Sequence, residues 1–461
     1  MRACFVLAVL GLALSGLAVD RTAVSYATAR PVLDEHRDRL PAALRNVDEA
    51  KWNAWTRQQD AAIRARLEVG DLDSMVNFLL FGTSFTKQPR VRIEGIVEAL
   101  RAGTVRARVD DLVAGLVSPG DNERLVFLRG LLRRKGINPQ TSGTGEIGMF
   151  LFNHLRRVLE EKKTLAEHSA SANPLAGPPV VSDAAALLKL RSGRFRDRGL
   201  SLDTSLFPNY SIEQALRDLK KNGLLREGRV SRVAVIGPGL DFTDKNEEAG
   251  YDYYPQQTMQ PFFLYDSLAR LRLAKAGALS VSVFDISPRL IEHLQSARER
   301  ARKNTGYVVQ LPYTQGPWPA GFSAYWRSAG DQVGAEIEPI QPPQALPGLR
   351  TRAVRIRPGV VLACDPLPLN IVLERIDVPA QDRFDVVVGT NVFLYYDDFE
   401  RALALENAGA MLKPGGILLS NDLLPELPGG SMRKIGITDV RYATQDGNRD
   451  AIVLYQKTSP K

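Results

Sequence analysis

The stretch Val233-Ala-Val-Ile-Gly-Pro-Gly-Leu-Asp241 decides the fold class of this protein. Residues 230–236 form a short apolar run rich in β-branched side chains, which predicts a buried strand. The run leads into Gly237-Pro-Gly239, where glycine allows a tight turn and a close approach of the backbone to a ligand. A buried strand that ends in such a turn is typical of open α/β sheets, which bind ligands outside the carboxyl ends of their strands.

Strands and helices alternate from this turn to the C-terminus. Helices are predicted for residues 261–274, 288–303 and 399–412, and strands for residues 279–285, 384–389, 417–420, 436–442 and 451–456. The alternation predicts a doubly wound, Rossmann-like α/β sheet that is covered by helices. The last two strands follow each other without a helix-length segment between them, which predicts a terminal antiparallel strand pair.

Two long segments interrupt this pattern. Residues from about 305 to 370 are far longer than a usual strand connection and include strand-like sequence, so we expect an inserted β-containing cap. We interpret it as a contact for the substrate, and the alternative is a purely structural role. The Tyr-rich stretch over residues 251–258 follows the first strand. We interpret its Tyr253 and Tyr254 as part of a lid or substrate wall, and the alternative is a surface loop packed by its own aromatic rings.

The chain before residue 230 has a different character. Residues 20–166 contain apolar residues at spacings of three and four with little strand-like alternation, which predicts a mainly α-helical domain. Residues 167–183 are rich in Ser, Ala, Pro and Gly and predict a linker. Residues 184–229 are then expected to be a helical lead-in to the α/β domain of residues 230–461.

The first 19 residues have the pattern of a targeting segment. Arg2 precedes an apolar run over residues 3–19 that ends in small residues, which is typical of a secretory signal peptide. We therefore expect an exported protein, periplasmic or secreted. The run is at the lower length limit for spanning a bilayer, so an uncleaved anchor is an alternative, and membrane contact is expected only through this run. A misassigned start would instead leave the protein cytoplasmic.

Composition excludes several classes of function. The chain has 60 Lys and Arg against 52 Asp and Glu, and a net charge of +8 over 461 residues gives no specific signal for a nucleic-acid partner. Its two cysteines, Cys4 and Cys364, exclude a disulfide framework. Its four histidines are scattered, so we predict no metal site.

Asp285 is the main candidate for a binding residue. It ends the second predicted strand of the α/β domain, where its carboxylate can accept hydrogen bonds from both hydroxyls of a ribose. The alternative is that it caps the helix predicted to begin at residue 288. A dinucleotide would need a third glycine where Phe242 stands. The acidic loop over residues 241–260 repels phosphate but tolerates a sulfonium cation, which favours S-adenosylmethionine over NAD.

With these motifs, residues 230–456 resemble the class I S-adenosylmethionine-dependent methyltransferases. The matching segments are Val235-Ile-Gly-Pro-Gly239, Phe284-Asp-Ile-Ser287, Glu374-Arg-Ile-Asp-Val-Pro379, Phe384-Asp-Val-Val-Val-Gly-Thr-Asn391 and Met411-Leu-Lys-Pro-Gly-Gly416. The run Thr390-Asn-Val-Phe-Leu-Tyr-Tyr396 is most similar to the chemotaxis-receptor glutamate methyltransferases. The resemblance implies S-adenosylmethionine as the cofactor, bound by Gly237, Pro238, Gly239, Asp241, Asp285, Ile286, Glu374, Arg375, Thr390 and Asn391.

The sequence departs from this family at two positions. The family commonly has an acid where this chain has Val235, and a third glycine where it has Asp241. Asp241 is therefore a candidate partner for the ammonium group of the cofactor. Methyl transfer from a sulfonium needs orientation and a dry site more than an acid or base, so no catalytic residue is assigned. Asn391 and Tyr395 are candidates for substrate contacts by their position.

Three functions stay open on the sequence alone. The first is a methyltransferase of unknown acceptor, which Gly237, Gly239 and Asp285 favour. The second is a catalytically silent, exported Rossmann-like binding protein, which the signal peptide favours because the cofactor is made in the cytosol. The third is an NAD-type oxidoreductase.

Overall fold

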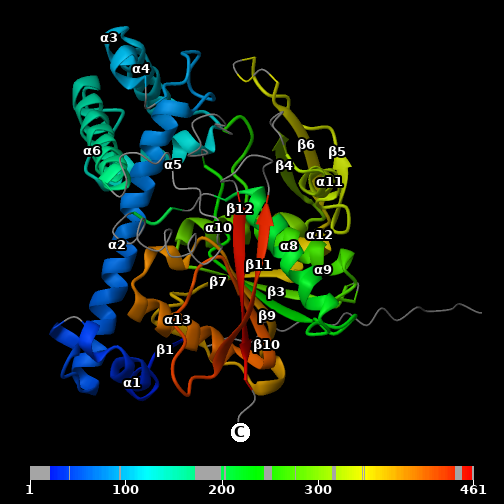
Figure 1. Cartoon of the computed structure of the whole chain (residues 1–461). Helices are drawn as coiled ribbons and strands as arrows, with labels where there is room; N and C mark the ends of the chain where they lie inside the picture. The colour runs from blue at the N-terminus through cyan, green and yellow to red at the C-terminus, as the bar shows by residue number, and fades with distance from the viewer. Residues whose placement is uncertain are drawn as a thin grey trace, which may run out of the picture.

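The core of the computed structural model is a mixed sheet with helices on both faces (Figure 1). The structure describes residues 21–458 except 41, 93–94, 172–198, 202–203, 243–251, 276, 314–317, 345, 347 and 442–448. The central strands are β2 (Arg232–Ile236), β3 (Ser280–Asp285), β7 (Cys364–Pro368), β9 (Phe384–Gly389), β10 (Leu412–Ser420), β11 (Met432–Arg441) and β12 (Arg449–Lys457).

The strand order in this sheet is β11-β12-β10-β9-β2-β3-β7. From β10 to β7 neighbouring strands run parallel, whereas β12 is antiparallel to both β10 and β11. The predicted doubly wound α/β fold with a terminal antiparallel strand pair is confirmed.

The sequence of β2 explains why both faces of the sheet are covered. Successive side chains of a strand point to opposite faces. Val233 and Val235 belong to the core on one face, and Ala234 and Ile236 belong to the core on the other. All of them are buried, so the continuous apolar run is that of a strand in the middle of a parallel sheet.

Different helices cover the two faces. The face of Val233 is packed by α8 (Leu206–Lys221), α9 (Gln260–Arg270) and α10 (Pro288–Arg302). The opposite face is packed by α1 (Tyr26–Glu35) and α13 (Asp398–Met411). At the edge of this second core, β1 (Arg21–Ala23) pairs antiparallel with β8 (Glu374–Ile376).

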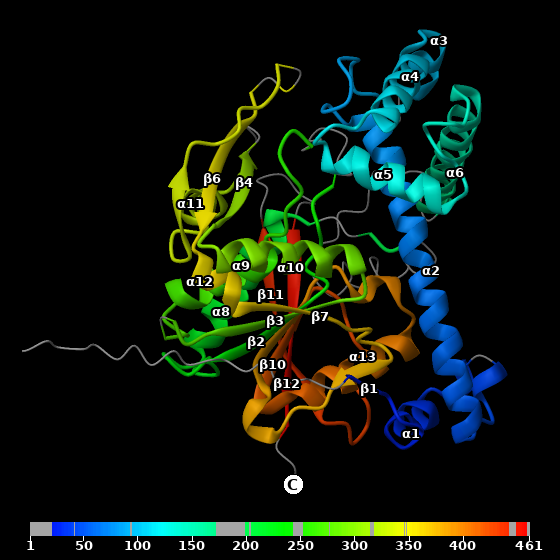
Figure 2. The same cartoon turned by 180° about the vertical axis from the view of Figure 1, so that it is seen from behind.

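The N-terminal region is mainly helical. Its helices are α2 (Glu49–Phe81), α3 (Ile96–Arg101), α4 (Thr104–Val117), α5 (Glu123–Arg134) and α6 (Thr144–Ser171), with short 3-10 turns at Arg37–Arg39 and Ala42–Leu44. Helix α2 runs along one side of the sheet and carries the other helices at its far end (Figures 1 and 2). In the part of the chain that the structure describes, no helix combines the length and apolar character needed to cross a membrane. The predicted signal peptide and most of the predicted linker lie outside the described residues.

The segment expected to be a cap forms a small sheet of its own. Its elements are β4 (Tyr307–Tyr313), α11 (Ala320–Ser328), β5 (Gly334–Ile337), β6 (Arg350–Ile356) and α12 (Pro358–Ala363), with the strands antiparallel in the order β4-β6-β5. The small sheet and the group of α3 to α6 rise on opposite sides of the same end of the molecule (Figures 1 and 2).

The insertion ends earlier than the expected residue 370, because Cys364–Pro368 forms β7 of the central sheet. The sequence does not predict this strand because it contains Pro366 and Pro368, and proline is rare within strands. Proline is tolerated there because β7 is the edge strand, so a missing backbone N–H breaks no ladder on the outer side.

Candidate functional site

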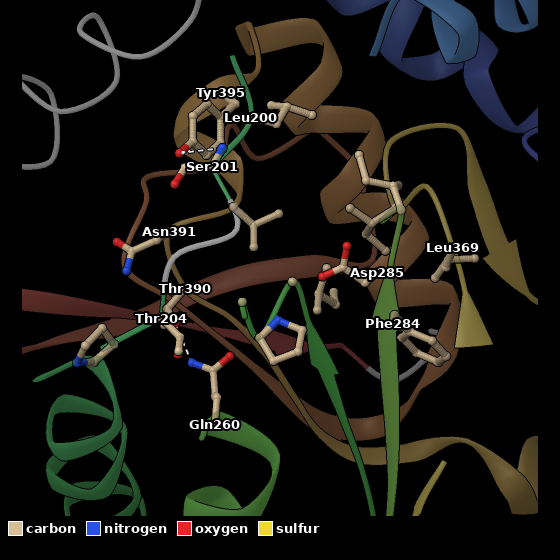
Figure 3. Close-up of a pocket in the computed structure, with 18 of the residues that line it drawn as sticks. Leu200, Ser201, Thr204, Gln260, Phe284, Asp285, Leu369, Thr390, Asn391 and Tyr395 are labelled. Atoms are coloured by element: carbon tan, nitrogen blue, oxygen red, sulfur yellow. Dashed lines mark hydrogen bonds between the residues drawn. The ribbon is translucent and has the colours of Figure 1, made fainter. Parts of the chain in front are cut away.

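A pocket lies at the carboxyl ends of three neighbouring strands (Figure 3). The chain runs from β2 outward through β3 to β7 and then returns to β9 on the other side of β2. Strand order therefore reverses between β2 and β9, and a crevice at such a switch point is the usual ligand site of an open α/β sheet. The pocket is lined by residues 236–239 at the end of β2, residues 284–286 at the end of β3 and residues 390–392 after β9.

The glycine turn after β2 forms the floor of the pocket. Gly237 and Gly239 have φ values of 61° and 78°, in the left-handed region that favours glycine. A Cβ atom on Gly237 would lie 2.5 Å from Cγ2 of Val392. Glycine at position 237 is therefore required both by backbone conformation and by the close approach of the segment after β9.

Asp285 lies in the pocket at the end of β3. Its side chain is buried, and Oδ1 accepts a hydrogen bond of 2.7 Å from the backbone N–H of Ser287. Burial raises the pKa of Asp285 to about 7, against the smaller opposing effects of the Ser287 and Ile286 N–H groups and of Arg289. The carboxyl group therefore both supports the turn before α10 and faces the pocket.

An apolar wall stands beside Asp285. It consists of Phe284, Leu369 and Ile371, which are all buried (Figure 3 labels Phe284 and Leu369). Leu369 and Ile371 come shortly after β7. Because the sequence does not predict β7, it does not predict this wall either. A flat aromatic ring next to a hydrogen-bonding carboxyl group would suit this half of the pocket.

Amide and hydroxyl groups line the opposite half. Gln260, the first residue of α9, donates from Nε2 to Oγ1 of Thr390 at 2.6 Å. Asn391 has a left-handed φ of 59°, which asparagine tolerates better than most residues. Its backbone N–H donates to Oδ1 of Asn421 at 2.7 Å, and Asn421 Nδ2 donates back to Asn391 Oδ1 at 2.9 Å. This reciprocal pair fixes the segment after β9.

The remaining wall of the pocket comes from α2, from the segment that leads into α8 and from the start of α8. Leu67 of α2 lines it together with Leu200, Ser201, Thr204, Ser205 and Pro208. Leu200 donates its backbone N–H to the carbonyl of Arg66 at 2.9 Å, and a Cβ atom on Gly70 would collide with the carbonyl of Leu200. The Ser201 N–H donates to the hydroxyl of Tyr395 at 3.3 Å. The sequence did not predict this wall. The local sign of it is Gly70 within α2, where the absence of a side chain admits the backbone of Leu200.

Eight of the predicted site residues line the pocket: Gly237, Pro238, Gly239, Asp285, Ile286, Thr390, Asn391 and Tyr395. Glu374 and Arg375 do not. They lie on β8, where Glu374 accepts a hydrogen bond of 2.9 Å from the Asn370 N–H and Arg375 contacts Asp377. The wall at this side is formed instead by the residues that follow β7.

Asp241 and the two loop tyrosines also lie outside the pocket lining. Asp241 is buried, and its Oδ2 accepts hydrogen bonds from the Tyr254 hydroxyl at 2.7 Å and from Gln257 Nε2 at 3.3 Å. The Tyr253 hydroxyl is hydrogen-bonded to Thr351 of the small sheet. The described part of the expected lid, from residue 252 on, therefore packs between the small sheet and the helical region.

Asp252 anchors this loop to the helical region. Its carboxylate accepts hydrogen bonds from the backbone N–H groups of Thr83 at 2.9 Å and Ser84 at 2.8 Å. Arg124 of α5 donates to the carbonyls of Phe242 and Tyr254. The described part of the loop after the glycine turn therefore connects the central sheet with the helical region and with the small sheet.

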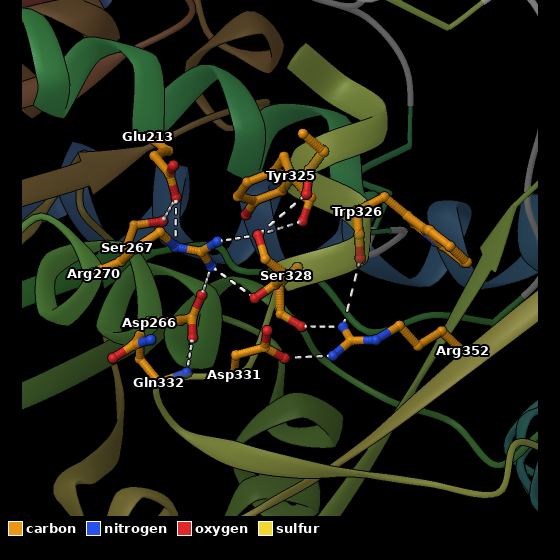
Figure 4. Close-up of polar contacts among 12 residues, drawn as sticks. Glu213, Asp266, Ser267, Arg270, Tyr325, Trp326, Ser328, Asp331, Gln332 and Arg352 are labelled. Atoms are coloured by element: carbon orange, nitrogen blue, oxygen red, sulfur yellow. Dashed lines mark hydrogen bonds and ion pairs between the residues drawn. The ribbon is translucent and has the colours of Figure 1, made fainter. Parts of the chain in front are cut away.

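A second cluster of titratable groups lies away from the pocket (Figure 4). Arg270 of α9 forms ion pairs with Asp266 on its own helix and with Glu213 of α8, and all three side chains are mostly buried. Desolvation raises the pKa of Asp266, and Arg270 opposes the shift. Asp266 Oδ1 also accepts the backbone N–H of Gln332 at 2.7 Å. The cluster thus holds the insertion against α8 and α9 and has a structural role.

Within the described ranges of the chain, no group of three or more His, Cys, Asp or Glu side chains is arranged to hold a metal ion.

Comparison with known proteins gives only distant structural matches. No protein-family model and no curated protein matches the sequence. Among solved structures, the N-methyltransferase NodS from Bradyrhizobium japonicum WM9 is 11% identical, with 55% of this chain and 98% of that chain covered and a TM-score of 0.28. The glycopeptide N-methyltransferase MtfA complexed with sinefungin is 10% identical, with 56% of this chain and 97% of that chain covered and a TM-score of 0.27. MtNAS in complex with MTA and tNA is 13% identical, with 80% of this chain and 96% of that chain covered and a TM-score of 0.24. The fold assignment therefore rests on the strand order and register described above.

Proposed function

We propose that the pocket binds S-adenosylmethionine and that the protein transfers the methyl group of this cofactor to an acceptor. The observation that carries the proposal is the placement of the Gly237-Pro-Gly239 turn and the Asp285 carboxyl group on adjacent strands at the switch point of the sheet. These two elements are what a nucleoside with a ribose and an extended substituent requires from a parallel sheet.

The residues present fit the cofactor. Asp285 would accept hydrogen bonds from the ribose hydroxyls, and the wall of Leu369 and Ile371 would contact the adenine ring. The amino-acid end would lie beside the Gly237-Pro-Gly239 turn, which lines the pocket. When bound, the cofactor supplies an electrophilic methyl group on a positively charged sulfur.

The chain itself has to orient the reactants and exclude water. Leu67 and Leu200 close the pocket from the side of α2, and Tyr396 adds a buried ring. An ionised carboxylate acceptor needs no base, which agrees with the lack of an assigned proton acceptor. The similarity of residues 390–396 to chemotaxis-receptor glutamate methyltransferases makes a carboxylate oxygen the first acceptor to test.

The structure disfavours the dinucleotide alternative. A pyrophosphate binds where a glycine turn runs directly into a helix N-terminus. Here α9 begins only at Gln260, and Phe242 occupies the position of the third glycine. Its ring is buried in the helical region against Phe78 and Phe127. The catalytically silent alternative uses the same pocket, so only a transfer assay separates it from the methyltransferase.

Two experiments test the proposal. Titration calorimetry with S-adenosylmethionine, S-adenosylhomocysteine and NAD compares the ligands directly. Incubation with methyl-labelled S-adenosylmethionine and small carboxylic acids or acidic peptides then tests transfer. Binding of S-adenosylmethionine with label transfer supports the enzyme, binding without transfer to any acceptor supports the silent protein, and binding of NAD alone supports the oxidoreductase.

A further inference from the structure

Gln260 carries a buried hydrogen-bond acceptor inside the pocket. Its side chain is only 4% exposed and lines the pocket at the start of α9. Nε2 donates to Thr390 Oγ1, which orients the amide, while Oε1 has no hydrogen-bond partner among the described residues. Figure 3 shows this oxygen turned away from Thr390. Because buried polar atoms are nearly always paired, the amide oxygen is placed to meet a donor on a ligand.

We propose that Gln260 Oε1 accepts a hydrogen bond from the ammonium group of S-adenosylmethionine, an inference that rests on the proposed function. The cofactor has donors only on the adenine amine, the ribose hydroxyls and the ammonium group. Its sulfonium and carboxylate groups donate none. Gln260 therefore selects for the free amino group at the amino-acid end of the cofactor.

The order of the strands assigns the donors. From one end of the pocket to the other, the lining comes from β9, β2, β3 and the segment after β7. The apolar wall of Leu369 and Ile371 lies at the β7 end, and Asp285 follows at β3. Gln260 is bonded to Thr390 at the β9 end, across the glycine turn from Asp285. If adenine and ribose occupy the first two places, the ammonium group is the donor left for Gln260.

The carboxylate of Asp241 is not placed for this task. It is buried outside the pocket lining, where it accepts hydrogen bonds from Tyr254 and Gln257. A neutral amide is sufficient because the amino-acid end of the cofactor is a zwitterion with no net charge to balance. The amide of Gln260 at the start of α9 thus takes the role that the sequence predicted for the Asp241 carboxylate.

Three ligands that differ only at the amino-acid end test the inference. They are S-adenosylhomocysteine, its analogue with hydrogen in place of the α-amino group, and methylthioadenosine, which lacks the amino-acid group. Gln260→Leu should weaken binding of S-adenosylhomocysteine roughly ten- to hundredfold, the range for a hydrogen bond to a charged group. The other two affinities should stay within about twofold. Gln260→Met should show the same pattern, and Gln256→Leu, which removes an amide outside this pocket, should change none of the three.

The outcomes distinguish the role of Gln260 from the binding of the cofactor itself. An equal loss for S-adenosylhomocysteine and the desamino analogue would place Gln260 against another part of the ligand and overturn the inference. So would an unchanged affinity for S-adenosylhomocysteine in both Gln260 variants, or an equal loss for all three ligands. In each of these cases wild-type binding still supports the proposed function. If the wild-type protein binds none of the three ligands, the proposed function itself fails.

Discussion

Replacing Asp285 by Asn separates a carboxylate that binds a ligand from one that only supports the chain. The variant keeps an oxygen that can accept the Ser287 N–H, so the turn before α10 should survive. It loses the negative charge that strengthens hydrogen bonds from ribose hydroxyls. At pH 8 we therefore expect Asp285→Asn to bind S-adenosylhomocysteine roughly tenfold or more weakly than the wild type.

The burial of Asp285 adds a pH dependence to this difference. Its pKa is raised from 3.8 to about 7, so the ligand-free carboxyl group is mostly protonated at pH 6. Binding through the carboxylate then requires loss of this proton. The wild-type affinity should fall about tenfold between pH 8 and pH 6 and about a hundredfold by pH 5. The affinity of Asp285→Asn should stay flat, so the two proteins become nearly equal at pH 6.

Stability gives a second readout of the same group. A carboxyl group whose pKa is raised by folding contributes to the unfolding free energy. This contribution is fully present below about pH 4 and is lost as the pH rises through 7. The difference between 3.8 and about 7 corresponds to about 4 kcal/mol of unfolding free energy lost by pH 8. Urea denaturation should show that the unfolding free energy of Asp285→Asn falls less between pH 4 and pH 8 than that of the wild type. Titration calorimetry at pH 5, 6, 7 and 8 measures the affinities, and a wild-type affinity that is independent of pH and equal to that of the variant would refute the reasoning.

Three further predictions follow from the rest of the molecule. Gly237→Ala places a Cβ atom against Val392 at a left-handed φ, so cofactor binding should fall at least tenfold with about 1–3 kcal/mol of lost stability; unchanged binding would show that the turn does not need glycine. Arg270→Met leaves the buried Asp266 without its ion pair and should cost about 3–5 kcal/mol in urea denaturation, and a cost below about 1 kcal/mol would contradict the structural role of this cluster. We also propose export through residues 1–19, in which case N-terminal sequencing of the protein from its native host should show a start near residue 19, whereas an intact Met1 in the cytosolic fraction would overturn it.

The sheet could be predicted from the sequence because its central strands are simple apolar runs. Apart from Arg232 in β2 and Asp385 in β9, the residues of these two strands are apolar or glycine and are buried, so the pattern is unambiguous. Strand β7 could not be predicted, because Pro366 and Pro368 argue against a strand unless that strand is known to lie at the edge of the sheet. Glu374 and Arg375, which the family resemblance implies as cofactor contacts, lie on β8 outside the pocket lining.

The residues of the pocket divide in the same way. Asp285 and the glycine turn could be found because their role depends on position at a strand end, which local pattern reveals. The wall from Leu67 and Leu200 depends on a helix that precedes the sheet by a long stretch of chain, and nothing local to either residue indicates the contact. Asp241 was predicted as a partner of the cofactor ammonium group because the chain lacks the family's acid at Val235, whereas in the fold its carboxylate lies outside the pocket lining and accepts hydrogen bonds from Tyr254 and Gln257.

Titration of S-adenosylhomocysteine into the wild-type protein at pH 8 is the most direct test of the central claim, because it needs no knowledge of the acceptor. We expect saturable binding at one site per chain, weakened at least about tenfold by Asp285→Asn, with no binding of NAD at the same concentrations. Absence of binding of S-adenosylhomocysteine, or binding that is indifferent to Asp285→Asn, would contradict it.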